Sequence, residues 1–429
     1  MEIVFLTLFL SVITTGTRTV QIQAPPGTAA VVFRLDGEQA AGLTGPPWSV
    51  VVDFGEELLP HELEASAFDS EGKLLAIARQ AVNMPHSLAE AYLAVETTPN
   101  GRRVARLRWN CAVATRPRDV RLTFDGERLD VTDPSTFVVP RFEAGTAHIL
   151  RAELDFGSNV TAMAEALVGS KDRDYASAEL TAVPVVPTEN RKRLDPADLA
   201  NALAARGKTL KIVAVEEGPA EVVFVVDPGA EPLLKEIRAD ATRPSRSGFR
   251  PSSFSISGEI LPYFMLPAPQ TYTETGFQIY PSVGPLDRAQ GGLLDAYFRM
   301  KHLHPRREES SFPRAAQLSG VLAVKNSRRR AVIWIVEANR DLSDPALESA
   351  RGFLRALNVP LVVWRVVPRG EKGGIPEGET AVSAPWQLEK AIETLESALK
   401  RQRIVWVEGR HLPQSIGLSP GVKGLQIAR

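Results

Sequence analysis

The stretch Val222-Val223-Phe224-Val225-Val226 is apolar at every position and is followed by Asp227. A strand without polar alternation is typical of the centre of a parallel sheet, because helices then cover both of its faces. Three later runs have the same character: Ala331–Val336, Leu361–Trp364 and Ile404–Val407. The chain is therefore predicted to form a doubly wound α/β sheet in its C-terminal half.

Amphipathic helical patterns separate these apolar runs. One pattern covers Leu347 to Leu357 and another covers Leu388 to Leu399, each with apolar residues at helical spacing. The pair Asp344-Pro345 supplies an N-cap and a first-turn proline for the earlier helix. This alternation of strand and helix supports the same α/β prediction.

The N-terminal half contains an internal repeat. The segment Val31–Glu38 resembles Val120–Glu127, and both read as alternating strands that end in an Asp-Gly turn. A His-containing strand follows each copy, at His61 and at His148. The two turns lie about ninety residues apart, which is close to the length of one immunoglobulin-like sandwich. The repeat therefore predicts two β-sandwich modules.

The domain boundaries follow from these patterns. Residues 17–90 and 91–183 are predicted to be the two immunoglobulin-like sandwiches, and residues 190–429 the α/β domain. The Pro-rich stretch Val183–Pro187 lies at the change of pattern, where an extended linker or a strand edge is expected.

The N-terminus contains an apolar run from Ile3 to Ile13, broken only by Thr7 and Ser11. The run is too short to span a bilayer but has the length of a signal-peptide core. Residues 1–16 are therefore predicted to be a signal peptide, cleaved or kept as an anchor, and the protein to be periplasmic, envelope-associated or extracellular. The alternative is a buried first strand. After signal cleavage, no integral membrane segment is expected.

Composition narrows the function classes further. The chain has 429 residues and a formal net charge of -1, so no overall field attracts nucleic acid. Its single cysteine, Cys111, excludes an internal disulfide framework and a multi-cysteine zinc site. The basic run Arg328–Arg330 is interpreted as a solvated turn.

The loops after the predicted strands carry the residues of interest. In a parallel sheet the functional crevice lies beyond the carboxyl ends of the strands. Asp227–Glu231 follows the first apolar run, Glu337–Arg340 follows the second, and Gly291–Ala296 lies between them. This arrangement resembles the von Willebrand factor A domain, and more narrowly the exported bacterial VWFA-related proteins, in which immunoglobulin-like modules precede that domain. The segments Leu354–Trp364 and Arg403–Ile416 are similar to the same family.

The resemblance implies a metal-ion-dependent adhesion site, Asp-x-Ser-x-Ser, completed by a Thr and an Asp on other loops. Asp227 matches the first Asp, Gly229 stands in place of the first Ser, and Glu231 stands in place of the second. Gly292 runs directly to Leu293 where the Thr is expected, and Glu337 replaces the final Asp.

Two interpretations of this site are open. In the first, the site is degenerate and the domain carries no cofactor. In the second, Asp227, Glu231 and Glu337 converge on Mg²⁺ or Ca²⁺, which prefer oxygen ligands. In both, the expected partner-binding residues are Asp227, Gly229, Glu231, Gly292, Glu337 and Arg340, with Arg340 as an anion contact.

The expected function is that of a non-catalytic, secreted or envelope-associated protein that binds a protein partner through the α/β domain. Ser, His and Asp residues are all present, but no Gly-x-Ser-x-Gly elbow follows a strand. The alternative is a carbohydrate-binding or cell-envelope-binding protein that acts through its β-sandwiches. In that alternative, Trp48 and Trp109 stack on sugar rings.

Overall fold

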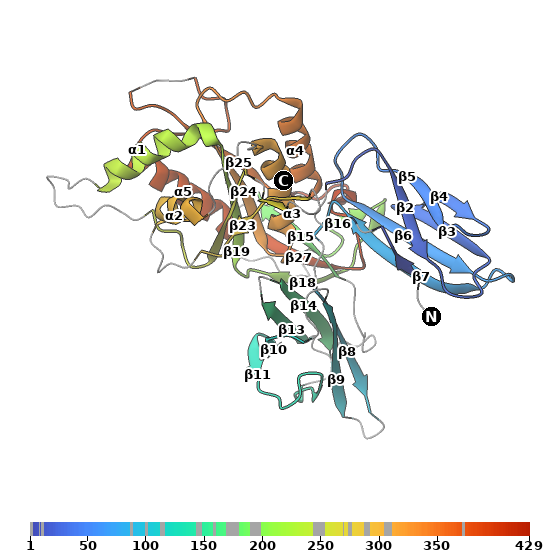
Figure 1. Cartoon of the computed structure of the whole chain (residues 1–429). Coiled ribbons are helices and arrows are strands. Elements are labelled where there is room, and N and C mark those ends of the chain that lie inside the picture. Colours follow the sequence, from blue (N-terminus) through green and yellow to red (C-terminus); the bar gives the residue numbers. More distant parts are fainter. Residues whose placement is uncertain are drawn as a thin grey trace. The chain divides into compact units, whose positions relative to one another are not determined.

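The computed structural model describes residues 3–7, 9, 13–85, 89–98, 102–111, 116–142, 148–157, 160–168, 180–188, 199–242, 254–268, 270–272, 277–286, 292–303, 311–370 and 374–429. Most of its regular elements are strands, and helices are few (Figure 1). The chain divides into two compact units. The first unit comprises Met1–Pro85, Ala182–Val407 and His411–Arg429, and the second comprises His86–Thr181 and Glu408–Arg410.

A six-stranded sheet lies at the centre of the first unit. Its strand order is β23-β20-β19-β24-β25-β26, and β20, β19, β24, β25 and β26 run parallel. The predicted central strand at Val222–Val226 is confirmed, because β19 pairs with a parallel neighbour on each side. The strands are β19 (Ala220–Val226), β20 (Ile260–Met265), β23 (Ser282–Val283), β24 (Arg329–Glu337), β25 (Leu361–Val366) and β26 (Thr380–Val382).

Helices cover both faces of this sheet (Figure 1). Helices α1, α2 and α5 pack on the face that includes Val222 and Phe224, and α3 and α4 pack on the face that includes Val223 and Val225. The Asp344 side chain caps α4 by accepting a 2.8 Å hydrogen bond from the Ala346 N–H, as predicted. The helices are α1 (Glu231–Thr242), α2 (Leu293–Leu303), α3 (Phe312–Val324), α4 (Pro345–Ala356) and α5 (Pro385–Arg401).

The apolar run Ile404–Val407 does not belong to the parallel sheet, so that prediction is wrong. It forms β27 (Arg403–Glu408) in a separate sheet ordered β18-β27-β15-β29. An apolar run identifies a strand buried on both faces but does not identify its neighbours. The Val183–Pro187 stretch also belongs to this sheet, as part of β15 (Leu180–Pro187). The other members are β18 (Ile212–Glu216) and β29 (Leu425–Ile427).

A small sheet ordered β17-β16-β28 packs with this one around a common apolar core. Leu203, Val405 and Ile416 are among the buried residues of that core. A two-stranded hairpin, β21 with β22, completes the described strands of the first unit outside its sandwich. These elements are β16 (Leu203–Ala205), β17 (Lys208–Thr209), β28 (Ile416–Leu418), β21 (Gln270–Tyr272) and β22 (Phe277–Ile279).

The prediction of a solvated turn at Arg328–Arg330 is wrong for Arg329 and Arg330. Arg329 and Arg330 are buried at the start of β24. The Arg330 guanidinium donates to the carbonyls of Asn358 and Leu357, and Arg329 donates to the carbonyls of Gly218 and Leu399. Burial lowers the pKa of Arg330 to about 10. Carbonyl groups at the ends of neighbouring elements need donors, and these buried arginines provide them.

The N-terminal sandwich of the first unit consists of two sheets, ordered β1-β2-β5 and β4-β3-β6-β7. Ile3, Phe5 and Phe9 are buried in its core, and β1 pairs with β2. This is the arrangement expected for a buried first strand, and removal of residues 1–16 stays a prediction. The strands are β1 (Val4–Phe5), β2 (Thr17–Gln23), β3 (Ala30–Leu35), β4 (Glu38–Leu43), β5 (Ser49–Asp53), β6 (His61–Phe68) and β7 (Leu74–Val82).

The second unit is also a sandwich, with sheets ordered β11-β10-β13-β14 and β12-β9-β8 around one apolar core. Leu107 and Leu150 are buried in that core from opposite sheets. The strands are β8 (Ala89–Thr97), β9 (Arg103–Cys111), β10 (Asp119–Phe124), β11 (Glu127–Leu129), β12 (Thr136–Val138), β13 (His148–Gly157) and β14 (Val160–Val168).

The predicted repeat corresponds to the same local structure in both sandwiches. Asp36 and Asp125 each begin an Asp-Gly turn with positive φ, at 55° and 51°. The Nδ1 atom of His61 lies 2.8 Å from Asp36, and that of His148 lies 2.6 Å from Asp125. The second carboxylate oxygen accepts the N–H of the residue after each histidine. We call this arrangement the Asp-His clasp, and it joins the turn to the facing strand.

The clasp in the second unit is expected to contribute to stability. Asparagine tolerates the left-handed backbone at position 125, so Asp125→Asn keeps the turn but places an amide donor opposite His148 Nδ1. The alternative tautomer is no better, because His148 Nε2 is buried without a hydrogen-bond partner among the described residues. We expect Asp125→Asn to cost about 1–3 kcal/mol.

Differential scanning calorimetry of the full chain measures this cost, since each kcal/mol lowers the Tm of a unit of this size by about 4–8 °C. Asp130→Asn is the matched control, because the Asp130 side chain is 95% exposed. Equal Tm values for both variants would show that the clasp has no energetic role.

Candidate functional site

The candidate site lies where β19 and β24 end at the carboxyl edge of the parallel sheet. Asp227 directly follows β19, and its N–H donates to the carbonyl of Ile335 on β24 at 2.8 Å. The short helix η1 (Pro228–Ala230) and then α1 continue from Asp227. Glu337 is the last residue of β24, and Arg340 follows it in the next turn. Parallel pairing therefore brings two of the predicted loops together.

Asp227 and Arg340 face each other across this edge. The Arg340 Nε atom lies 3.9 Å from Asp227 Oδ2, with 6% of the Asp227 side chain and 32% of the Arg340 side chain exposed. The Arg340 guanidinium also lies over the ring of Phe312, 5.8 Å from its centroid. A cation on an aromatic face and beside a carboxylate is held by two attractive contacts. The Asp227 carboxylate thus has a guanidinium beside it.

Glu231 has a different partner. It is buried at the start of α1, where a carboxylate is favoured by the helix dipole. The Tyr297 hydroxyl on α2 donates a 2.8 Å hydrogen bond to Glu231 Oε1. This contact links the first turn of α1 to α2 inside the core.

Gly229 and Glu337 lie in direct proximity. A Cβ atom built on Gly229 would lie 2.7 Å from Glu337 Oε2 and 2.9 Å from its Cδ atom. The absence of a side chain at position 229 therefore leaves room for the Glu337 carboxylate. A Ser side chain at position 229 would compete for the same space, so Gly229 and Glu337 fit each other structurally.

Gly292 does not join this group through any contact that the structure describes. It precedes α2, and its carbonyl accepts the N–H of Ala296 at 2.9 Å. Leu293, where a Thr was expected, is buried in the core against α1 and α5. The preceding residue, Gly291, lies outside the described residues.

Arg365 supports the loop that carries Glu337 and Arg340, and it was not among the predicted site residues. Its guanidinium donates to the carbonyls of Ala338 and Arg340, both at 2.8 Å. It is buried on β25 and forms an ion pair with Glu379. The available signal was a single arginine inside an otherwise apolar strand. Buried arginine needs acceptors, and here the loop carbonyls are those acceptors.

The edge also contains an ordered turn after Arg340. The Ser343 N–H and hydroxyl both donate to Asp341 Oδ1, at 2.9 and 2.7 Å. These hydrogen bonds, led by that from the backbone N–H, lower the pKa of Asp341. Asp341 is therefore fixed as a carboxylate next to Arg340.

As placed, the predicted ligands do not fit a divalent cation. Within the described ranges, no group of three or more His, Cys, Asp or Glu side chains is arranged to hold a metal ion. Asp227 faces a guanidinium, Glu231 bonds a tyrosine, and Gly229 supplies no side-chain oxygen. Both interpretations of the metal site remain predictions for the titration described below.

The two tryptophans proposed as sugar platforms are partly buried. Trp48 packs against the core of the first sandwich, and Trp109 packs against the core of the second. Trp386, at the start of α5, is instead 62% exposed and was not among the predicted residues. No described helix is both long and apolar enough to cross a membrane.

Comparison with known proteins identifies neither a family nor a curated relative. No protein-family profile matches the chain, and no curated protein matches it. The solved structures that it resembles include fibronectin(III)-like modules of Clostridium thermocellum CbhA, with 17% identity over 19% of this chain and 92% of theirs (TM-score 0.17). A von Willebrand factor type A structure from Catenulispora acidiphila shows 10% identity over 58% of this chain and 74% of its own (TM-score 0.25).

The expectation that the chain is not an enzyme is corrected by the same comparison. The similar structures include enzymes, among them a β-glucuronidase from Ruminococcus gnavus. It shows 10% identity and covers 92% of this chain and 78% of its own (TM-score 0.17).

The Tyr297–Glu231 hydrogen bond is expected to stabilise the junction of α1 and α2. Tyr297→Phe removes the donor and leaves a buried carboxylate oxygen with one hydrogen bond fewer, at a cost of about 1–3 kcal/mol. Tyr263→Phe is the control, because the Tyr263 hydroxyl has no hydrogen-bond partner among the described residues. In calorimetry, only Tyr297→Phe should lower the Tm, by about 2–4 °C per kcal/mol. An equal decrease in both variants would contradict this role.

Proposed function

We propose that the chain is an exported binding protein that recognises an acidic group of a protein partner at the carboxyl edge of its parallel sheet. Arg340 is the main contact, and no divalent cation is required. Export rests on the apolar run from Ile3 to Ile13.

The observation that carries the proposal is the state of the Arg340 guanidinium. Its Nε atom is buried and has no hydrogen-bond partner among the described residues, and Asp227 lies 3.9 Å away. About a third of the side chain is nevertheless exposed, at 32%. A guanidinium binds a carboxylate through two parallel hydrogen bonds. An acidic partner group would therefore accept hydrogen bonds from the exposed part of this guanidinium.

The surroundings support the same mode of recognition. Phe312 lies beneath the guanidinium and limits its movement, and Arg365 fixes the carbonyls of the loop. A preorganised contact loses less side-chain entropy on binding than a mobile one. Asp227 partly neutralises the charge of Arg340. A partner carboxylate would therefore take the place of Asp227 beside the guanidinium and bind reversibly.

The role of cations is tested by calorimetric titration of the full chain with Mg²⁺, Ca²⁺ and Mn²⁺. We expect no saturable heat, because Asp227 faces Arg340 and Glu231 bonds Tyr297. Capture of partner proteins by the immobilised chain should survive excess chelator. Arg340→Gln should weaken that capture about tenfold or more, as expected for a lost charge-assisted contact.

Arg128→Gln is the matched control, since it removes the same charge from a side chain that is 70% exposed in the second unit. Micromolar cation binding abolished by Asp227→Ala would contradict the proposal. Partner capture that depends on the cation, or that is equally sensitive to both arginine variants, would also contradict it.

A further inference from the structure

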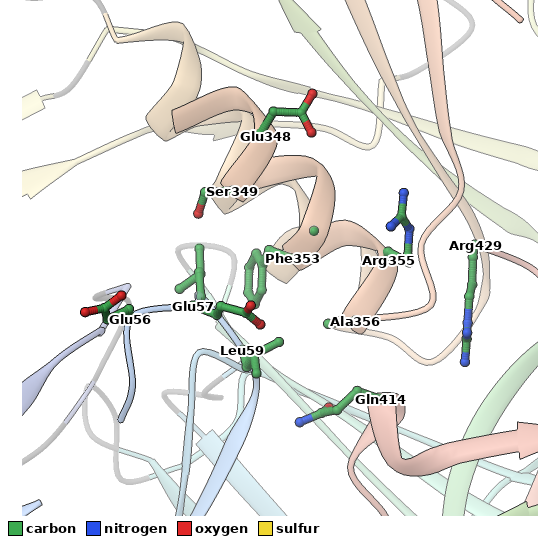
Figure 2. A pocket seen from close by; sticks show the side chains of 12 residues that line it. Glu56, Glu57, Leu59, Glu348, Ser349, Phe353, Arg355, Ala356, Gln414 and Arg429 are labelled. Carbon is green, nitrogen blue, oxygen red and sulfur yellow. The ribbon is translucent and has the colours of Figure 1, made fainter. Parts of the chain in front are cut away.

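A pocket of about 570 Å³ opens on the outer face of α4, within the first unit (Figure 2). One wall is the loop Glu56–Leu59 after β5, and another is the helix face from Glu348 to Ala356. Gln414 and Arg429 close the remaining side. The volume falls within the range of small-ligand sites, about 300–1,000 Å³. None of its lining residues belongs to the Asp227–Arg340 site.

The base of the pocket is apolar. Leu58, Phe353 and Ala356 line it, and all three are buried. Gly352 contributes open space, because a Cβ atom built there meets no other heavy atom within 4 Å. An aliphatic side chain could therefore occupy this part of the pocket and lose its contact with water.

Charged groups of opposite sign line two sides of the pocket, and a further acidic residue, Glu348 on α4, is paired with Arg351. Glu56 and Glu57 lie on one side of it, and Arg355 and Arg429 lie on the other (Figure 2). In the described part of the chain, the side chains of Glu56, Glu57 and Arg355 have no hydrogen-bond or ion-pair partner. The Arg429 guanidinium is held by the side chain of Asn358, at 3.0 Å, and by the carbonyl of Ile416, at 3.2 Å.

From this juxtaposition we propose that the pocket binds a peptide segment of a partner in which an apolar residue lies between a basic and an acidic residue. The apolar side chain occupies the space above Gly352 and Phe353. The basic side chain contacts Glu56 and Glu57, and the acidic one contacts Arg355 and Arg429. A ligand that carries only one sign of charge is attracted by one wall of the pocket and repelled by the other. The pocket therefore favours a ligand that carries both a positive and a negative group.

The test uses three capped tripeptides as probes of the full chain: acetyl-Lys-Leu-Glu-amide, acetyl-Lys-Leu-Lys-amide and acetyl-Glu-Leu-Glu-amide. Saturation-transfer NMR titration gives their relative affinities. The mixed-charge peptide should bind saturably and more tightly than either of the others, by about two- to fivefold as expected for one exposed ion pair. Absence of saturable binding, or equal binding of all three, would overturn the proposal.

Gly352→Leu is the decisive variant, because it directs an aliphatic side chain toward the pocket from a position where a Cβ atom meets no other heavy atom within 4 Å, and it replaces glycine in α4 with a better helix former. The fold is therefore retained, and affinity for the mixed-charge peptide should fall at least about tenfold, as for loss of a buried aliphatic contact. Gly352→Ala is the control and should leave the affinity unchanged. Peptide binding that persists unchanged in Gly352→Leu would locate it elsewhere and overturn the proposal.

Discussion

Burial of β19 on both faces is the constraint on which the rest of the α/β part depends. Every residue of the strand from Ala220 to Val226 is at most 1% exposed. Such a strand is stable only when helices cover the sheet on both sides, and parallel pairing requires the helical crossovers that provide this cover. The strand then ends abruptly at Asp227, so that a carboxylate lies at the edge where neighbouring strands also end.

The chemistry of that edge follows from what surrounds Asp227. Arg340 faces it, Glu337 lies against Gly229, and Glu231 turns into the core toward Tyr297. Three acidic residues that could have repelled one another are thereby directed to three different environments. Arg365 holds the loop in place by donating hydrogen bonds to two of the loop's carbonyl groups. The Arg340 guanidinium is thus a partly exposed positive group at this edge.

Local chemistry made part of this structure predictable from the sequence. The central strand at Val222–Val226, the cap at Asp344 and the paired turns at Asp36 and Asp125 all depend on residues close together in the chain. The sheet assignment of Ile404–Val407 depended on non-local pairing, which periodicity does not encode. The burial of Arg330 was missed for the same reason, since its acceptors on Leu357 and Asn358 are distant in sequence. For the site, sequence order indicated that the loops at Asp227 and Glu337 meet, but not that Gly292 lies outside this group or that Arg340 lies beside Asp227.

Amide hydrogen exchange of the full chain, alone and after capture of its partner in excess chelator, tests the central claim most directly. The account predicts new protection in residues 227–231 and 337–341, with no requirement for added cation. Protection confined to the strands of the β-sandwiches, or protection at this edge that appears only when Mg²⁺ or Ca²⁺ is restored, would contradict it.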